Sequence, residues 1–343
     1  MKKPIILISG IDANTANPAP GTPVAESIKY GMDCHIVGLA YSAYETGIFD
    51  STFDKTFILP YPSDEMQVYK KALFRIFEEV KPDIYIPCLD VELPVVNYFL
   101  DEIEAMGIKT LFPTTNQFDS VSKKNIYNLC CDAGVESPFS KIVSDVNSLV
   151  KIESEIKYPL VLKGPYYGAV IVYNLAHAVA EYNRIVSMWG TPITAQTIVK
   201  ESIELDLCAI GDGLGGFINP LAIRKMHLLA QGKVGVGVTV HNDEILVIAK
   251  RIFAHTKWRG PLELEFLFGK NHKPYLIEVN PRFPAWIEFS SKIEYNLPLS
   301  LVQMILGQKC EIEKQYDAGK MLIKRTTNIV SDIKAFTEIG NIF

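Results

Sequence analysis

The sequence predicts an α/β domain with a parallel sheet, followed by an α+β region built on an antiparallel sheet. Short apolar strand patterns alternate with helical patterns over the first 115 or so residues, which is typical of a doubly wound parallel sheet. From Thr197 onward the strand patterns follow one another with single helices between them, which favours antiparallel pairing. At 343 residues the chain exceeds one average domain, so two or three subdomains are expected.

The first region is expected to end its strands at a ligand-binding edge. Its predicted strands cover 5–8, 34–39, 56–59, 83–87 and 108–111, and its predicted helices cover 22–30, 65–80 and 93–106. The loop from Gly10 to Gly21 lacks G-x-G-x-x-G, so no dinucleotide fingerprint is present. Ligands of such sheets lie beyond the carboxyl ends of the strands, which makes Asp90 and Glu92 candidates for substrate contact. An acidic helix N-terminus explains the same two residues.

Two further regions follow a hinge near Gly134. A helix over 123–133 is expected to stop at this glycine, just before Ser137-Pro138. We expect domains at 1–115, 116–195 and 196–343. The remaining predicted strands cover 159–163, 169–173, 198–201, 204–210, 217–226, 233–240 and the hairpin 261–282, and the remaining helices cover 175–188, 243–256 and 286–306.

The hairpin 261–282 carries the most informative pattern. With a turn at 270–273, period-2 alternation places four polar side chains on one face and four apolar ones on the other: Glu263, Glu265, Glu278 and Asn280 against Leu262, Leu264, Ile277 and Val279. Glu265 is then opposite Glu278. Like charges opposite each other repel, so this pair predicts a cation between them, and two carboxylates with an amide suit Mg²⁺, with Mn²⁺ as a substitute. Arg282 offers a fork for a phosphoryl group. The alternative is a solvent-facing acidic surface with an arginine at its rim.

Weaker signals for a nucleotide precede the hairpin. Lys163 ends an apolar strand directly before the turn 164–168, where it can reach phosphate oxygens beside backbone N–H groups. A strand-end lysine extending to water is the alternative. The alternation over 198–203 suits a strand that flanks a flat base, and Asp206 is placed to accept hydrogen bonds from a ribose.

Taken together, these motifs resemble the ATP-grasp superfamily, and in particular one ATP-binding half of the carbamoyl-phosphate synthase large subunit. The resemblance covers essentially the whole chain and implies an N-terminal Rossmann-like domain followed by a two-lobed ATP-grasp fold. It implies that ATP phosphates meet Lys163 and Lys124, with Lys123 as the next candidate for the latter. It implies contacts of Glu201 and Ile203 with adenine, of Asp206 with ribose, and of Glu265, Glu278 and Asn280 with the metal.

One departure from the family lies in the phosphate-covering loop. Here it has two glycines, Gly164 and Gly168, and no Ser or Thr, so fewer backbone N–H groups are free to wrap a phosphate. Gly168 remains a candidate ATP contact. A second departure is Asp206, which stands where the family usually has a glutamate.

The resemblance implies an ATP- and Mg²⁺-dependent ligase that joins a carboxylate to an amine or thiol through an acyl phosphate. Arg282 and Lys163 would neutralise the transferred charge. Arg224, Lys225 and Arg259 are candidates for binding the substrate carboxylate. Two alternatives stay open: an enzyme that forms carbamoyl phosphate or carboxyphosphate, and a nucleotide-binding protein without turnover.

Composition limits the partners. The formal net charge is −5 and no basic run occurs, which argues against a nucleic-acid partner. No segment approaches the roughly twenty apolar residues of a membrane span, and the apolar run after Met1 is too short for a leader peptide. Six cysteines without C-x-x-C spacing indicate a reducing cytoplasm. We therefore expect a cytoplasmic protein with small-molecule substrates. A homodimer is compatible with this expectation.

Overall fold

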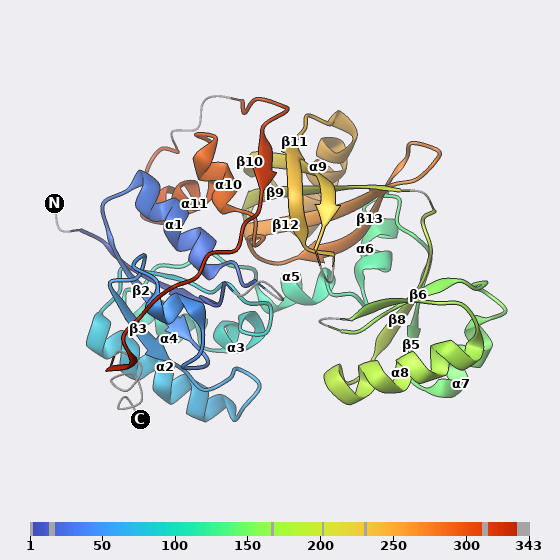
Figure 1. Ribbon diagram of the computed structural model, residues 1–343, viewed down its shortest axis with the longest axis horizontal. Coiled ribbons are helices and arrows are strands. Elements are labelled where there is room, and N and C mark those ends of the chain that lie inside the picture. The colour runs from blue at the N-terminus through green and yellow to red at the C-terminus, as the bar shows by residue number, and fades with distance from the viewer. Residues whose placement is uncertain are drawn as a thin grey trace.

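The computed structural model describes residues 3–13, 18–165, 168–200, 202–229, 232–310 and 315–334. Over these residues the chain forms three β-sheets, each in a separate part of the molecule (Figure 1). We call these parts the N-terminal domain, the central lobe and the C-terminal lobe. The predicted combination of a parallel sheet with antiparallel sheets is confirmed.

The N-terminal domain is built on a parallel sheet with strand order β3-β2-β1-β4. The predicted strand at 108–111 is wrong, because only a single bridge joins Lys109 to Ile84 there. The predicted helix 93–106 is interrupted at Phe99. The elements are β1 (Ile5–Ser9), α1 (Gly21–Gly31), β2 (His35–Ala40), η1 (Thr46–Phe49), β3 (Lys55–Ile58), α2 (Met66–Val80), β4 (Ile84–Ile86), α3 (Leu93–Tyr98) and α4 (Leu100–Ala105).

The central lobe is a four-stranded antiparallel sheet with order β5-β8-β6-β7, packed against two helices. It projects away from the N-terminal domain at the lower right of Figure 1. The predicted strand over 198–201 is wrong: β8 ends at Thr197, and no strand is assigned to 198–200. The elements are β5 (Ser140–Val143), α7 (Val146–Ile152), β6 (Leu160–Lys163), β7 (Ala169–Val172), α8 (Leu175–Trp189) and β8 (Ile193–Thr197).

The C-terminal lobe is a six-stranded sheet with order β13-β12-β9-β10-β11-β14, and its recorded pairs are all antiparallel. The predicted helix 286–306 is two helices. The elements are β9 (Ile203–Asp212), β10 (Phe217–Leu228), β11 (Val234–Thr239), α9 (Asp243–Thr256), β12 (Arg259–Phe268), β13 (Pro274–Asn280), α10 (Glu288–Lys292), α11 (Leu297–Leu306) and β14 (Met321–Ile323). Two further helices, α5 (Thr115–Ser120) and α6 (Ile126–Asp132), precede the central lobe.

Hydrophobic packing joins the N-terminal domain to the C-terminal lobe. One buried cluster contains Ile6 and Ile28 of the first and Ile210 and Leu301 of the second, and α1 packs on α10 and α11. The central lobe has a buried cluster of its own, around Leu160 and Ile185. The two larger parts therefore form one body beside the central lobe.

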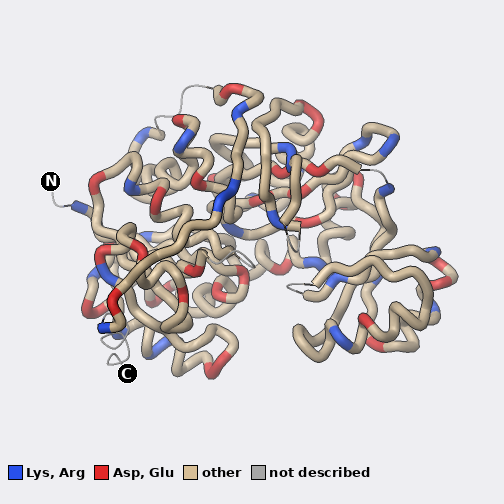
Figure 2. The backbone as a smooth tube through the Cα atoms, viewed as in Figure 1, with Lys and Arg blue, Asp and Glu red and all other residues tan. Residues whose placement is uncertain are grey.

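The outer surface carries charges of both signs. Figure 2 shows Lys and Arg interspersed with Asp and Glu along the chain in this view. No helix among the described residues is long and apolar enough to cross a membrane.

Glu92 is a buried structural residue, so its predicted substrate role is wrong. Its side chain is 0% exposed and accepts hydrogen bonds from the hydroxyls of Ser9, Tyr41 and Tyr69 and from the backbone N–H of Leu89. Burial raises the pKa of Glu92, and these hydrogen bonds oppose the rise. The carboxylate thereby ties the ends of β1, β2 and β4 together.

We expect Glu92→Ala to lower the free energy of unfolding by about 2–4 kcal/mol, because it leaves several buried donors without an acceptor. Denaturant unfolding measures this, with the exposed Glu78→Ala on α2 as the control. Equal stability of the two variants would contradict the structural role.

Candidate active site

The predicted register of the carboxylate hairpin is confirmed. Glu265 of β12 pairs with Glu278 of β13, and Glu263 pairs with Asn280. A bulge follows, because Phe266 pairs with Leu276 and leaves Ile277 as an extra residue. The prediction that Ile277 lies on the apolar face is therefore wrong: Leu276 is buried in the core, whereas Ile277 lines the cleft.

The row of facing carboxylates is longer than the hairpin. Across the neighbouring strand β9, Glu265 pairs with Asp206, so Glu278, Glu265 and Asp206 stand side by side on three consecutive strands. Asp206 is 1% exposed. Burial raises its pKa well above the ordinary range, although Lys225 opposes the rise.

Lys225 of β10 neutralises this row from the other side. Its Nζ lies 3.1 Å from Asp206, 2.9 Å from Glu265 and 3.2 Å from Glu204. Burial alone would lower the pKa of Lys225, but these carboxylates raise it. In turn the pKa of Glu265, which burial would raise, falls to about 2 beside the ammonium group. Lys225 is thus a cation beside Glu265 that the protein itself supplies, and the metal site between Glu265 and Glu278 stays a prediction.

Glu263, in the pair next to Glu265–Glu278, holds the amide of Asn280 and the guanidinium group of Arg282 in place. The Nδ2 atom of Asn280 donates to Glu263 at 2.9 Å and to Glu265 at 2.8 Å. Glu263 also accepts from Trp286 Nε1 at 2.9 Å and from Arg282 Nη1 at 3.2 Å. Asn280 is thereby oriented with its amide oxygen as the atom left for a ligand.

Two lysines reach this surface from outside the C-terminal lobe. Lys163, at the end of β6, donates from Nζ to the carbonyl oxygen of Ile277 at 3.0 Å. Burial lowers its pKa, partly offset by Glu278. Lys123, just before α6, places Nζ 3.1 Å from Glu278. The predicted first choice, Lys124, turns instead to Asp119 at 2.8 Å.

These residues line one cleft of about 710 Å³ between the central and C-terminal lobes. Arg282 crosses to the N-terminal domain, where its Nε lies 3.1 Å from Asp90. The predicted residues in the lining are Asp90, Lys123, Lys163, Gly168, Asp206, Lys225, Glu265, Glu278, Asn280 and Arg282. Those that the sequence reasoning did not assign include Trp189, Glu204, Lys233, Glu263, Trp286 and Lys324.

Several predicted site residues lie elsewhere. Arg224 is exposed on the face of β10 opposite Lys225, so its predicted role in the cleft is wrong. Arg259 is the first residue of β12, opposite Asp212 and outside the cleft lining, so its substrate role stays a prediction. Ile203, at the start of β9, is 43% exposed. Glu201 lies outside the described residues, as do Tyr166 and Tyr167 of the phosphate-covering loop.

The donor set fits a divalent cation. Carboxylate oxygens of Glu265 and Glu278 and the amide oxygen of Asn280 are the hard ligands that Mg²⁺ and Mn²⁺ prefer. In the described part of the chain, no group of three or more His, Cys, Asp or Glu side chains is arranged to hold a metal ion. A cation held here would therefore complete its coordination with oxygen atoms of a ligand, as Mg²⁺ does with phosphates.

Comparison with known proteins identifies the fold. No family model matches the sequence. The carbamoyl phosphate synthase large chain of Vibrio vulnificus is 24% identical over 227 residues, which cover 61% of this chain and 21% of that protein. The chain thus spans about a fifth of the length of the curated relatives it matches.

Solved structures of other proteins match the fold of this chain over most of its length. The biotin carboxylase domain of Hydrogenobacter thermophilus 2-oxoglutarate carboxylase, in complex with MgADP and bicarbonate, matches at a TM-score of 0.68 and 16% identity, covering 90% of this chain and 70% of that one. An L-amino acid ligase from Bacillus licheniformis matches at 0.70 and 18%, covering 93% and 78%. The chain has the ATP-grasp fold.

Removing the buried ammonium group tests the site's electrostatics. We expect Lys225→Met to cost about 3–5 kcal/mol of unfolding free energy, because Asp206 and Glu265 lose their counter-ion. The pKa values of Glu204 and Asp206 are raised in the folded protein, although Lys225 opposes the rise. A carboxyl with a raised pKa favours folding at low pH and opposes folding as pH rises, and without Lys225 this effect grows. The loss of unfolding free energy should therefore be larger at pH 8 than at pH 5. Denaturant unfolding at both pH values checks this.

Arg224→Met is the matched control, since Arg224 is the exposed neighbour on the same strand. A loss for Lys225→Met that equals the control at both pH values would contradict the counter-ion role.

Proposed function

We propose that the chain is an ATP- and Mg²⁺-dependent ligase that activates a small-molecule carboxylate as an acyl phosphate and joins it to an amine or thiol. One observation carries the proposal: lysines reaching in from outside the C-terminal lobe meet its carboxylate, amide and guanidinium groups in a single cleft. This combination suits a nucleoside triphosphate, because its phosphate oxygens are bound by cationic side chains and by a metal ion that carboxylate and amide oxygens hold.

Each side chain has a defined part in the proposal. Lys163 and Lys123 would contact the phosphates, whereas Lys124 is paired with Asp119. Glu265, Glu278 and Asn280 would hold Mg²⁺, which would neutralise phosphate charge when bound. Glu204 lies on the same face of β9 as Asp206 and is the less buried of the two, so Glu204 is the better placed to meet a ribose.

Arg282 would stabilise the group in transfer. Its guanidinium is fixed between Asp90 at 3.1 Å and Glu263 at 3.2 Å, so it presents a preoriented positive charge. A carboxylate oxygen of the substrate would attack the γ-phosphorus and ADP would leave. The amine would then attack the acyl carbon, losing a proton as inorganic phosphate leaves.

Bicarbonate belongs to the same class of substrate. The 2-oxoglutarate carboxylase domain was solved with bicarbonate and the Bacillus protein is an L-amino acid ligase, and both support a carboxylate substrate here. The decisive experiment measures ADP release with Mg²⁺, ATP and a panel of amino acids, simple carboxylates and bicarbonate, followed by mass spectrometry of the products. ADP release that depends on both a carboxylate and Mg²⁺ supports the proposal. No release with any member, despite nucleotide binding, would make the protein a non-catalytic nucleotide binder.

Lys163 provides a test of nucleotide placement. We expect Lys163→Ala to weaken ADP binding by roughly 1.5–3 kcal/mol, because it removes a charge-assisted hydrogen bond to phosphate. Titration calorimetry measures the change, and Lys141→Ala, an exposed lysine of the same lobe, is the control. An unchanged ADP affinity would show that the phosphates do not lie beside β6.

Glu278 provides a test of the metal. Glu278→Gln keeps the shape and loses a partly exposed ion pair with Lys123 and an attraction to Lys163, but it also removes the repulsion from Glu265. The unliganded protein should therefore change in stability by about 1 kcal/mol or less. We expect it to abolish turnover and to remove the rise in melting temperature that Mg²⁺ gives the nucleotide complex. Glu155→Gln, which also loses one lysine partner, should keep both properties. Survival of both in Glu278→Gln would disprove the metal assignment.

A further inference from the structure

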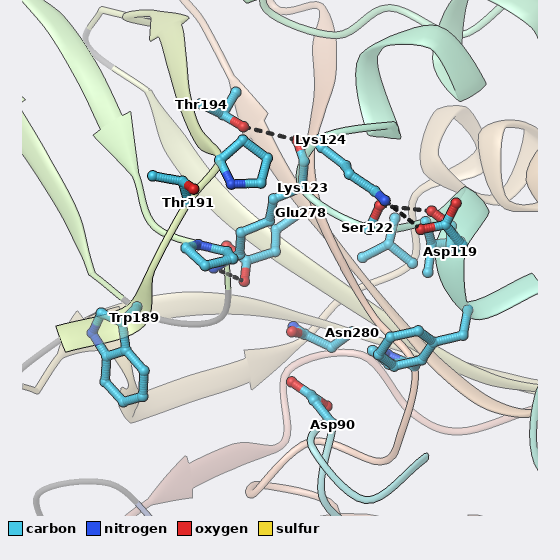
Figure 3. Close-up of a pocket in the computed structure, with 16 residues that line it drawn as sticks. Asp90, Asp119, Ser122, Lys123, Lys124, Trp189, Thr191, Thr194, Glu278 and Asn280 are labelled. Carbon is cyan, nitrogen blue, oxygen red and sulfur yellow. Dashed lines mark hydrogen bonds and ion pairs between the residues drawn. The ribbon is translucent and has the colours of Figure 1, made fainter. Parts of the chain in front are cut away.

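A second cavity of about 280 Å³ opens beside the nucleotide cleft (Figure 3). We call it the side pocket. Its walls come from the α5–α6 connection, the loop between α8 and β8, and the end of β13. Its lining and that of the cleft share Asp90, Lys123, Trp189, Glu278 and Asn280, so the two spaces meet at the proposed metal ligands.

Seven of the sixteen residues that line the side pocket are apolar. Apolar side chains that line it are Phe118, Val121, Pro165, Trp189, Pro192, Val279 and Pro281. Several polar residues that line the side pocket but not the cleft have partners within the protein: Lys124 Nζ lies 2.8 Å from Asp119, the Ser122 hydroxyl donates to the Asp119 carbonyl at 2.6 Å, and Thr194 donates to the Lys123 carbonyl at 3.2 Å. A charged ligand group would have to compete with these internal partners, whereas an apolar group would bury its surface against the apolar part of the lining.

Position and size restrict what enters. The reacting carboxylate must lie near Arg282 and Asn280, where the transferred charge is neutralised, and the side pocket opens at Asn280 and Glu278. Whatever is attached to that carboxylate therefore has this apolar space beside it. The volume is near the lower end of the range of about 300–1,000 Å³ for small-molecule sites, which suits one compact group.

We propose that the side pocket binds the apolar group of the carboxylate substrate, so that the substrate is a small carboxylic acid carrying a branched aliphatic or aromatic group. This rests on the proposed function of the cleft. Thr191 and Phe118 line the side pocket without taking part in the nucleotide site, so they set its size. Trp189, which lines both spaces, separates the substrate's apolar group from the nucleotide.

The test uses titration calorimetry on protein saturated with Mg²⁺ and a non-hydrolysable ATP analogue. The probes are L-leucine, L-phenylalanine, 4-methylpentanoate and glycine, and the last lacks an apolar group. Thr191→Trp fills the side pocket, and Val150→Trp, at a 54% exposed position on α7, is the matched control. A parallel ADP titration of each variant shows that its nucleotide site is intact.

We expect at least one apolar probe to bind the wild type and the control equally, and Thr191→Trp to weaken it roughly tenfold or more, while any glycine binding stays unchanged. Phe118→Ala, which enlarges the side pocket, should shift preference from L-leucine towards L-phenylalanine. This second variant keeps the test valid where Thr191→Trp does not fold.

Two results would overturn the proposed role of the side pocket. Either no apolar probe binds the wild type, or Thr191→Trp and Phe118→Ala leave the affinities for apolar probes unchanged. A parallel assay of ADP release, with ATP in place of the analogue, separates this from failure of the proposed function. Pocket-dependent binding without ADP release refutes the ligase alone. ADP release at equal kcat/KM for glycine and L-leucine, unaffected by both variants, retains the ligase and removes the side pocket.

Discussion

The buried ammonium group of Lys225 is the interaction on which the site depends. It lies within 3.2 Å of carboxylates on β9 and β12, and one of these, Asp206, is almost fully buried. Such carboxylates cannot stay charged away from water without a counter-ion. Lys225 thus lets the sheet assemble an acidic row before any cation from solution arrives. The row keeps Glu278 at its outer end, where Lys123 is a more exposed and more easily displaced partner.

Placement of the lysines then explains how the lobes work together. The Lys163 ammonium binds the carbonyl oxygen of Ile277, which the bulge turns towards the cleft. Burial lowers the pKa of Lys163, so phosphate oxygens arriving beside it would favour its charged form. The Arg282 guanidinium links the C-terminal lobe to Asp90 of the N-terminal domain. All three parts of the molecule therefore contribute to one site.

The sequence predicted the fold class and the hairpin because both depend on short-range periodicity. Alternation gave the pairs Glu265–Glu278 and Glu263–Asn280 correctly, but it could not show the bulge that moves Ile277. Long-range register was outside its reach: the placement of Asp206 beside Glu265, and of Lys225 beside Glu204, follows from how β9, β10 and β12 align. The choice between Arg224 and Lys225 as the residue in the cleft required knowledge of which face of β10 points towards the cleft. Glu92 was misjudged because strand-end carboxylates look alike whether they face a ligand or a buried tyrosine cluster.

The most direct test of the account is a crystal structure with Mg²⁺ and a non-hydrolysable ATP analogue. The account predicts the cation at about 2.0–2.1 Å from oxygens of Glu278, Asn280 and the analogue's phosphates, with Glu265 in its coordination sphere. Lys163 should contact the phosphates, and Lys225 should remain with Asp206 and Glu204. A nucleotide bound outside the cleft, or a cation that touches neither Glu278 nor Asn280, would contradict it.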